Sequence, residues 1–237
     1  MRAIDIHAHW YPQEWLQLFE KDGAKEGARL ERTAGGYRLK TETLVNSFDE
    51  RFVELASRIE KMDEKRFWAV YAKAEELGWA IFLHPVETIG RERTGKYYLR
   101  NLLGNPYDTG VAAAHLIFGG VLDRFAKLEI NLPHAGGAFP GLIGRLDHGT
   151  KVRPELKHMK RLPSEYLRRF TYDTIGHDDR INMNLIRLVG ADRVTLGSDY
   201  CFDMGLEDPL AAVQRLQLSA KEKGLIAGGN AARLLRL

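Results

Sequence analysis

Disulfide bonds are excluded within this chain, because its 237 residues include a single cysteine, Cys201. A lone cysteine is typical of proteins from reducing compartments, so a cytoplasmic location is expected. The sequence also lacks any apolar run as long as a membrane-spanning helix. Its opening residues, from Met1 to His7, include charged side chains and no long apolar stretch, which argues against a secretory signal peptide. We therefore expect a soluble, intracellular protein.

A strong charge of either sign is absent as well. Lys and Arg together number 35 and Asp and Glu 32, which leaves a formal net charge of +3 at pH 7. Because the basic residues are scattered, nothing indicates a nucleic-acid partner, and the small positive excess suits a small anionic substrate. Apolar residues make up 44% of the chain and charged residues 28%, as in ordinary globular proteins. We expect residues 1–237 to form one domain.

Short apolar runs alternate with amphipathic segments through the second half of the chain, which is typical of parallel strands joined by crossover helices. A β-hairpin is predicted around Gly35 and Gly36. Strands are predicted at residues 3–7, 79–83, 128–132, 171–174 and 194–197. Helices are predicted at residues 15–21, 52–62, 67–77, 109–125, 181–189, 210–223 and 230–235. An α/β fold follows, either as an open sheet or as a closed (β/α)₈ barrel.

Five residues that can bind a metal ion or carry a proton come at the ends of these strands: His7, His9, His84, His134 and Asp199. Side chains two positions apart on a strand point to the same side, so the first two histidines can share one ion. In a parallel barrel the carboxyl ends of the strands converge on one mouth, where active sites lie. The pattern therefore predicts a metal site.

Each of these residues also has an ordinary explanation when it is taken alone. A His-x-His pair can lie on the surface, His84 before Pro85 can be a turn residue, and Asp199 can be the N-cap of a following helix. His177 also follows a strand end and could approach the mouth, but we do not assign it to the site. The coincidence of five such residues at matching strand ends favours the metal site over these explanations.

Four segments carry a resemblance to a known family. Residues 5–9 (DIHAH), 83–85 (LHP), 133–139 (PHAGGAF) and 196–200 (LGSDY) resemble the amidohydrolase-related decarboxylases. That group includes aminocarboxymuconate-semialdehyde, γ-resorcylate and 5-carboxyvanillate decarboxylases, and also a hydratase. The resemblance implies a (β/α)₈ barrel of the TIM type, with a β-hairpin inserted after the first strand, and a homodimer.

The resemblance also implies the roles of individual residues. It places a Zn²⁺ ion, or alternatively Mn²⁺, on the ligands His7, His9, His84 and Asp199. It makes His134 the catalytic acid/base, acting with Asp199 and a metal-bound water. Arg38 in the hairpin is the nearest match to the family arginine that binds the substrate carboxylate, and Phe202 is retained as a pocket residue.

Two departures from the family pattern stand out. The residue after His84-Pro85 is Val86, where the aminocarboxymuconate enzyme has tryptophan, so the substrate is expected to differ. Only five barrel strands are predicted, and at Asp63-Glu64 the chain passes directly from one predicted helix to the next. Five strands cannot close an eight-stranded barrel. Either about three strands are missing near this junction, or the protein is a shortened form with an open sheet. We favour the first explanation, because both flanks of the junction resemble the family sequence.

The function predicted from the sequence is a metal-dependent decarboxylase, a carbon–carbon lyase, acting on an aromatic or unsaturated carboxylic acid. The same ion and base could activate water, so a metal-dependent hydrolase or hydratase on the same scaffold is the first alternative. A non-catalytic metal-binding paralogue is the second. A measurement of CO₂ release distinguishes the decarboxylase from both alternatives, because neither of them releases CO₂.

Overall fold

The structure is a computed structural model. It describes the backbone of residues 28–33, 36–41 and 44–45, and it describes residues 65–237 apart from 86, 87, 89, 91 and 201, together with Ala3 and Lys21. The predicted strand at residues 3–7 and the predicted helices at 15–21 and 52–62 therefore lie almost wholly outside the described residues. The same holds for His7, His9, Val86 and Cys201 and for the Asp63-Glu64 junction.

The predicted hairpin is confirmed as an antiparallel sheet. Its strands are β1 (Ala28–Thr33), β2 (Gly36–Thr41) and β3 (Leu44–Val45). Thr33 pairs with Gly36, so the connection between β1 and β2 is residues 34–35 rather than the two glycines. Gly36 therefore belongs to β2 and not to the connection between the strands.

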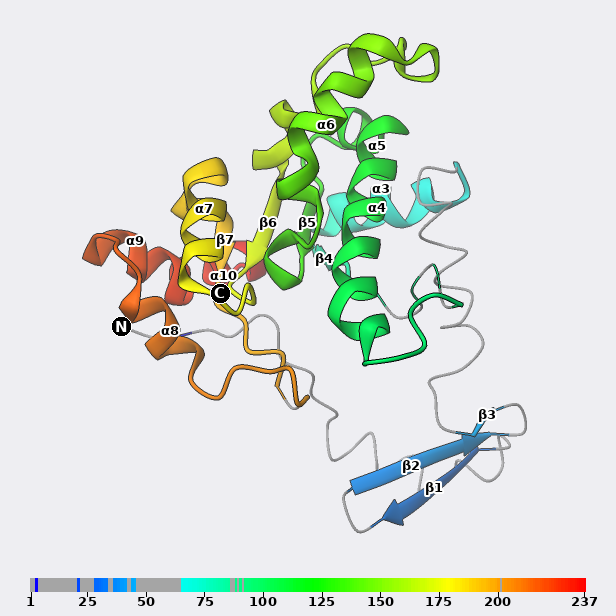
Figure 1. Ribbon diagram of the computed structural model, residues 1–237, viewed down its shortest axis with the longest axis vertical. Coiled ribbons are helices and arrows are strands. Elements are labelled where there is room, and N and C mark those ends of the chain that lie inside the picture. Colours follow the sequence, from blue (N-terminus) through cyan, green and yellow to red (C-terminus); the bar gives the residue numbers. More distant parts are fainter. Residues whose placement is uncertain are drawn as a thin grey trace.

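The second sheet is parallel, which confirms the α/β class. It contains β4 (Ala80–Phe82), β5 (Glu129–Leu132), β6 (Phe170–Asp173) and β7 (Val194–Thr195), in that spatial order. All neighbouring pairs run parallel. Figure 1 shows the four strands next to one another in chain order. Within the described residues β4 and β7 each have one neighbouring strand, so closure into a barrel stays a prediction.

Helices connect and flank these strands. The α-helices are α3 (Trp68–Leu77), α4 (Asn105–Phe118), α5 (Val121–Arg124), α6 (Phe139–Val152), α7 (Asp179–Val189), α8 (Pro209–Arg215), α9 (Ala220–Gly224) and α10 (Asn230–Leu235). Shorter or wider helical turns are η2 (Lys65–Phe67), η3 (Arg100–Gly104), η4 (His134–Gly136), η5 (Pro154–Leu156), η6 (Pro163–Arg169), η7 (Ala191–Arg193) and η8 (Leu225–Gly229). Across the described part of the chain, none of them has the length and apolar character needed to cross a bilayer.

Two helix predictions were wrong in their boundaries. The helix expected at residues 109–125 begins earlier, at Asn105, and is broken at Gly119-Gly120 into α4 and α5. Gly120 has a φ of +71°, a conformation that glycine adopts without a steric cost and that ends the helix. The helix expected at residues 210–223 is also two helices, because Leu216 is extended and Ser219 starts α9 with a capping box.

Helix α6 was not predicted from the sequence at all. Its 14 residues include Pro140 and the glycines Gly141, Gly144 and Gly149, a composition with poor intrinsic helix propensity. Pro140 stands in the first turn, where proline is tolerated because its missing N–H has no helical partner. The following residues form the helix because tertiary packing outweighs propensity.

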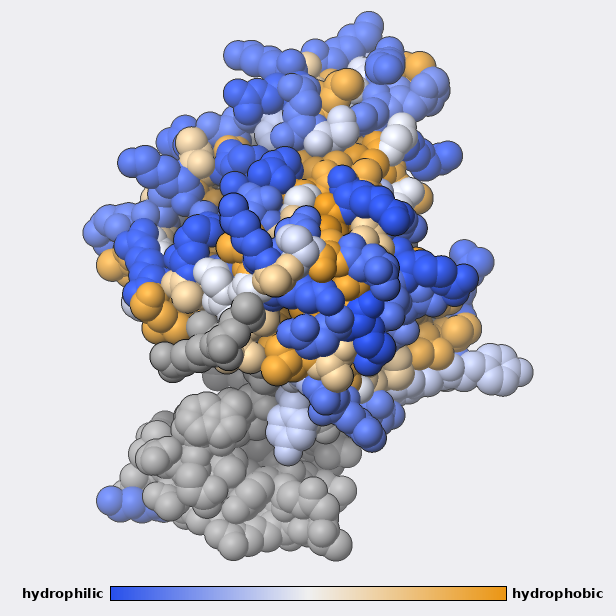
Figure 2. All heavy atoms as spheres, turned by 90° about the vertical axis from the view of Figure 1, so that its left-hand side faces the viewer, coloured by the Kyte–Doolittle hydropathy of each residue, from blue (hydrophilic) through white to orange (hydrophobic). Residues whose placement is uncertain are grey.

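The core is formed by the parallel sheet together with helix α4 and the buried residues of α3 and α7. Ala112, Ala113, Leu116 and Ile117 of this helix are fully buried, and so are the apolar residues of β5 and β6. All four residues of β6 are buried, as expected for a parallel strand covered on both faces. On the face shown in Figure 2, hydrophilic residues cover most of the surface and apolar side chains are visible between them.

Buried polar side chains form a row across the sheet. The amide nitrogen of Asn131 on β5 donates to the hydroxyl oxygen of Thr171 on β6 (3.1 Å) and to that of Thr195 on β7 (3.4 Å). The Thr195 hydroxyl in turn donates to the Tyr172 carbonyl oxygen at 2.9 Å. Such pairing is what buried polar groups require, and it keeps the three strands in register beneath the site.

Candidate metal centre

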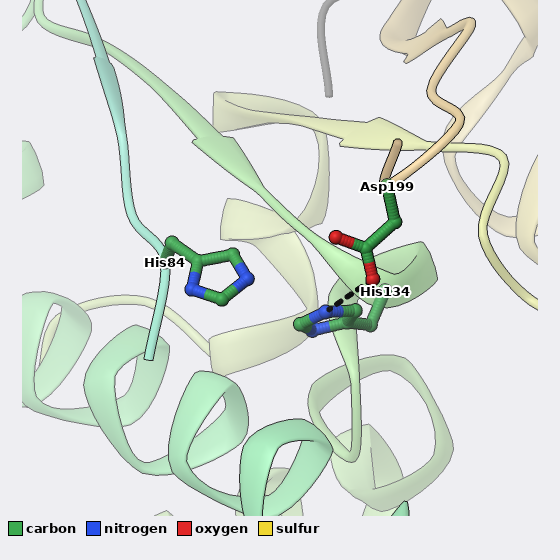
Figure 3. Close-up of side chains that lie close together, drawn as sticks. All are labelled: His84, His134 and Asp199. Carbon is green, nitrogen blue, oxygen red and sulfur yellow. Dashed lines mark ion pairs between the residues drawn. The ribbon is translucent and has the colours of Figure 1, made fainter. Parts of the chain in front are cut away.

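Three of the strands deliver a metal-capable residue to one place. His84 follows β4, His134 follows β5 and Asp199 follows β7. One ligand atom from each of them lies within 4.8 Å of the ligand atoms of the other two. Figure 3 shows the His84 ring directed toward the other two side chains from the opposite side of the site. Parallel strand order explains this convergence, because the carboxyl ends of neighbouring strands share one edge of the sheet.

His84 is held by ring contacts. Its imidazole stacks on Phe82, the last residue of β4, with ring centroids 6.4 Å apart and an interplanar angle of 16°. It meets the ring of His134 edge-on, with centroids 5.1 Å apart and an angle of 67°. Pro85, which is buried, follows immediately and prevents regular continuation of the strand. The two imidazole rings are therefore in direct contact across the site.

His134 stands on a turn of unusual backbone conformation. Residues His134, Ala135, Gly136 and Gly137 all have positive φ, at +55°, +54°, +80° and +56°. A Cβ atom on Gly136 would lie 2.7 Å from the Tyr172 ring, and one on Gly137 would collide with the Pro106 carbonyl. The turn thus needs both glycines, and this requirement accounts for the His-Ala-Gly-Gly sequence.

Asp199 is the most enclosed member of the site, with 5% of its surface exposed. Its carboxylate Oδ2 lies 4.0 Å from Nε2 of His134. Its φ is +56°, and its carbonyl oxygen accepts the backbone N–H of Phe202 at 3.1 Å. The Ser198 hydroxyl accepts the N–H of Tyr200 at 3.1 Å. A buried carboxylate beside two imidazoles creates a negative site that attracts a cation.

A pocket of about 710 Å³ opens onto this cluster, with His134 and Asp199 in its wall. Apolar residues make up much of the rest of the wall, including Ile175, Leu185 and Leu188. Polar groups are fewer, and His177 and Arg187 are among them. Pockets of this size, largely apolar with a few convergent polar groups, are typical of small-molecule sites.

Sequence comparison identifies the family of this chain. The sequence model of the amidohydrolase family matches residues 14–237. The chain belongs to the amidohydrolase family. A similar curated protein is 2-amino-3-carboxymuconate-6-semialdehyde decarboxylase of Dictyostelium discoideum, 35% identical over 190 residues that cover 78% of this chain and 53% of the relative. The chain therefore spans about half the length of that relative.

Solved structures show the same relationship. The 5-carboxyvanillate decarboxylase of Sphingomonas paucimobilis superposes with a TM-score of 0.67 at 25% identity, and the match covers 78% of this chain and 64% of that decarboxylase. The dihydroxybenzoic acid decarboxylase of Polaromonas sp. JS666, solved with manganese and the inhibitor 2-nitroresorcinol, superposes with a TM-score of 0.66 at 22% identity. This match covers 74% of the present chain and 55% of the dihydroxybenzoic acid decarboxylase. The second likeness shows a shared fold.

The remaining residues predicted for the amidohydrolase site fall in different places. Arg38 lies on β2, paired with Glu31 on β1, and its side chain lies outside the described residues. Phe202 lies on the turn after Asp199 and is 54% exposed. The roles predicted for these two residues stay predictions, as do those of the ligands outside the described residues.

Sequence reasoning overlooked Asp173 and gave too little weight to His177. Asp173 is the last residue of β6. The strand was expected to continue to Thr174, so Asp173 was not recognised as a strand-end residue. A signal was available, because an aspartate that closes an apolar strand resembles the positions of the other site residues. His177 has a φ of +54° and lines the pocket, so its place after a strand end was informative.

Proposed function

We propose that this protein is a metal-dependent decarboxylase acting on an aromatic or unsaturated carboxylic acid. His7, His9, His84 and Asp199 would hold the ion, and His134 would serve as the acid/base. The observation that carries this proposal is the convergence of His84, His134 and Asp199, whose ligand atoms lie within 4.8 Å of one another at the ends of three strands. The decarboxylases among its relatives support the choice of reaction.

The chemistry of the donor set fits a divalent ion. Imidazole and carboxylate are ligands that Zn²⁺ and Mn²⁺ both accept, and catalytic zinc sites use such ligands while keeping one position open. We propose zinc, with manganese as the alternative. When bound, the ion would supply Lewis acidity, polarising a substrate oxygen and lowering the pKa of bound water.

The pocket suits a flat, apolar substrate with one charged end. Its apolar wall would pack against an aromatic ring or a conjugated chain, while the polar cluster at His134 and Asp199 would face the reacting end. Arg38 of the hairpin would bind the carboxylate through paired N–H donors. Val86 would leave more room at the position where the aminocarboxymuconate enzyme has tryptophan.

His134 would supply the proton in the reaction. The bond between the substrate carbon and its carboxyl carbon breaks, CO₂ leaves, and the electron pair stays on the substrate carbon. A proton from the His134 imidazole then forms the new C–H bond, and solvent restores the proton to the ring. The Asp199 carboxylate, 4.0 Å from Nε2, would stabilise the protonated ring before transfer.

Elemental analysis and CO₂ release test this proposal together. The probes are 2,6-dihydroxybenzoate, 5-carboxyvanillate and 2-amino-3-carboxymuconate-6-semialdehyde. We expect His134→Ala to keep its metal while its turnover falls roughly 100- to 10,000-fold, the usual contribution of a general acid/base. His84→Ala and Asp199→Ala should lose the metal.

His148→Ala, which changes an exposed histidine of α6, is the matched control and should retain both metal and turnover. Full turnover of His134→Ala would remove this residue from the mechanism. Purified protein without a stoichiometric divalent ion would contradict the metal site. Opening of lactones without release of CO₂ would show that the chain is a hydrolase.

A further inference from the structure

Strand β6 contributes no residue to the metal-capable cluster of His84, His134 and Asp199, but it lies between two of the strands that do. It lies between β5, which leads to His134, and β7, which leads to Asp199. Its last residue, Asp173, is completely buried. A buried carboxylate is costly unless its oxygens accept hydrogen bonds, so the partners of Asp173 indicate its purpose.

The Asp173 carboxylate accepts hydrogen bonds from three backbone N–H groups. Its Oδ2 accepts from His134 at 3.0 Å, and its Oδ1 accepts from Ala135 at 2.8 Å and from Ile175 at 3.0 Å. The first two donors belong to the left-handed turn that carries the proposed acid/base. Positive φ at a residue other than glycine is a strained conformation, and it persists where the surroundings stabilise it.

The next residue, Thr174, connects β6 to the other side of the site. Its hydroxyl oxygen accepts the backbone N–H of Gly197 at 3.2 Å, two residues before Asp199. Its carbonyl oxygen accepts the side-chain amide of Asn182 on α7 at 3.1 Å. The end of β6 is therefore tied to the loop of His134 through Asp173 and to the loop of Asp199 through Thr174.

From these contacts we infer that Asp173 is a positioning residue for His134, which it holds at its distance and angle from Asp199. This inference rests on the proposed role of His134 as acid/base. The carboxylate fixes the backbone of the turn, and the turn fixes the direction in which the imidazole leaves the chain. A displacement of a catalytic group by about 1 Å can lower a rate by roughly 100-fold.

The test is Asp173→Asn, compared with Asp178→Asn as a matched control. Asparagine has nearly the same volume, but its amide nitrogen cannot accept a hydrogen bond, so at least one of the three backbone N–H groups loses its partner. We expect kcat to fall about 10- to 100-fold while KM changes little, because the acid is misplaced rather than the substrate. Asp178 is the N-cap of α7, a role that asparagine also fills, so its variant should keep wild-type values.

Two measurements that do not depend on activity accompany the kinetics. In nuclear magnetic resonance spectra of Asp173→Asn, the imidazole signals of His134 should move, whereas in Asp178→Asn they should not. In the wild-type chain, the backbone amides of His134 and Ala135 should exchange with solvent as slowly as those of β5. If Asp173→Asn does not fold, slow exchange of these two amides in the wild-type chain supports the inference and rapid exchange contradicts it.

Unchanged kcat and unchanged His134 signals in Asp173→Asn would overturn the inference, as would rapid exchange of the two amides in the wild type. Failure of the proposed function would look different. The wild-type chain would then release no CO₂ from any probe, while the ring signals and the amide exchange would still report on Asp173.

Discussion

At the scale of single residues, the site depends on backbone conformations that most side chains avoid. His134, Ala135 and Asp199 are not glycines, yet each has a φ between +54° and +56°. Asp173 stabilises the first two through their N–H groups, and Gly136 and Gly137 complete the turn where no Cβ fits. Strained backbone at such a place is consistent with a functional role.

Gly137→Ala tests this turn. With φ at +56° and the Pro106 carbonyl in the path of a Cβ, alanine should destabilise the protein by about 1–3 kcal/mol. Urea unfolding followed by circular dichroism measures the change. Gly144→Ala in α6 is the control, because a Cβ there meets no atom within 4 Å, and it should stabilise the protein by about 0.5–1 kcal/mol. Equal stability of the two variants would contradict the requirement for glycine at position 137.

At the scale of elements, helix α6 shows how packing outweighs composition. Phe139 is buried, and its ring meets Phe170 of β6 edge-on with centroids 5.6 Å apart. Ile143 and Leu146 pack against the core one and two turns later. These contacts offset the cost of the helix glycines, which is about 1 kcal/mol each. The propensity of the segment alone could not have predicted the helix.

A second contact between elements predicts a response to pH. The Tyr166 hydroxyl of η6 donates to Asp123 of α5 at 2.7 Å, and burial, followed by this hydrogen bond, raises the pKa of Tyr166 to about 12. A raised pKa in the folded state means that the contribution to stability is complete below pH 10 and is lost as the pH rises toward 12. Burial also raises the pKa of Tyr172, which adds to the same loss.

We therefore expect the free energy of unfolding to decline above pH 10. Tyr166→Phe should be less stable than the wild type at pH 7, by about 1 kcal/mol, because Asp123 loses its donor. Its stability should fall less steeply above pH 10. Urea titrations at pH 7, 10 and 11 measure both effects. If the free energy of unfolding declined equally with pH in the two proteins, Tyr166 would not be the source of the pH dependence.

At the scale of the whole molecule, the site is assembled from segments that are distant in sequence. More than one hundred residues separate His84 from Asp199, and only the order β4-β5-β6-β7 brings them together. An ion that binds such residues binds the folded chain and not the unfolded chain. Binding of this kind is coupled to folding.

Metal addition should therefore raise the melting temperature. At an ion concentration 100 times the dissociation constant, one site contributes about 2.7 kcal/mol to stability. Calorimetry of the chain after chelation, and after reloading with Zn²⁺ or Mn²⁺, measures the shift. The melting temperatures of His84→Ala and Asp199→Ala should not rise on metal addition, whereas that of His148→Ala should rise as in the wild type. The same melting temperature with and without the ion would rule out a site of this kind.

Much of this architecture could be predicted from the chain alone. Apolar runs and flanking glycines are local signals, so the four described strands of the parallel sheet, helices α3 and α7 and the hairpin were all expected. The placement of His84, His134 and Asp199 after three of these strands was also expected, because strand ends can be located from the same runs. The sequence by itself therefore determined the α/β class and which residues could form the cluster.

The tertiary structure alone decided how these residues are held. The Asp173 carboxylate accepts hydrogen bonds from the backbone N–H groups of His134 and Ala135, which are 39 and 38 residues away. Periodicity in a single sequence cannot predict contacts over such separations. Helix α6 likewise depends on partners elsewhere in the fold, through Phe139 and the core residues it packs against. Local sequence patterns determine helices and strands, because these form between residues that are close along the chain. The geometry of the site depends on contacts between residues far apart in the sequence, which only tertiary packing brings together.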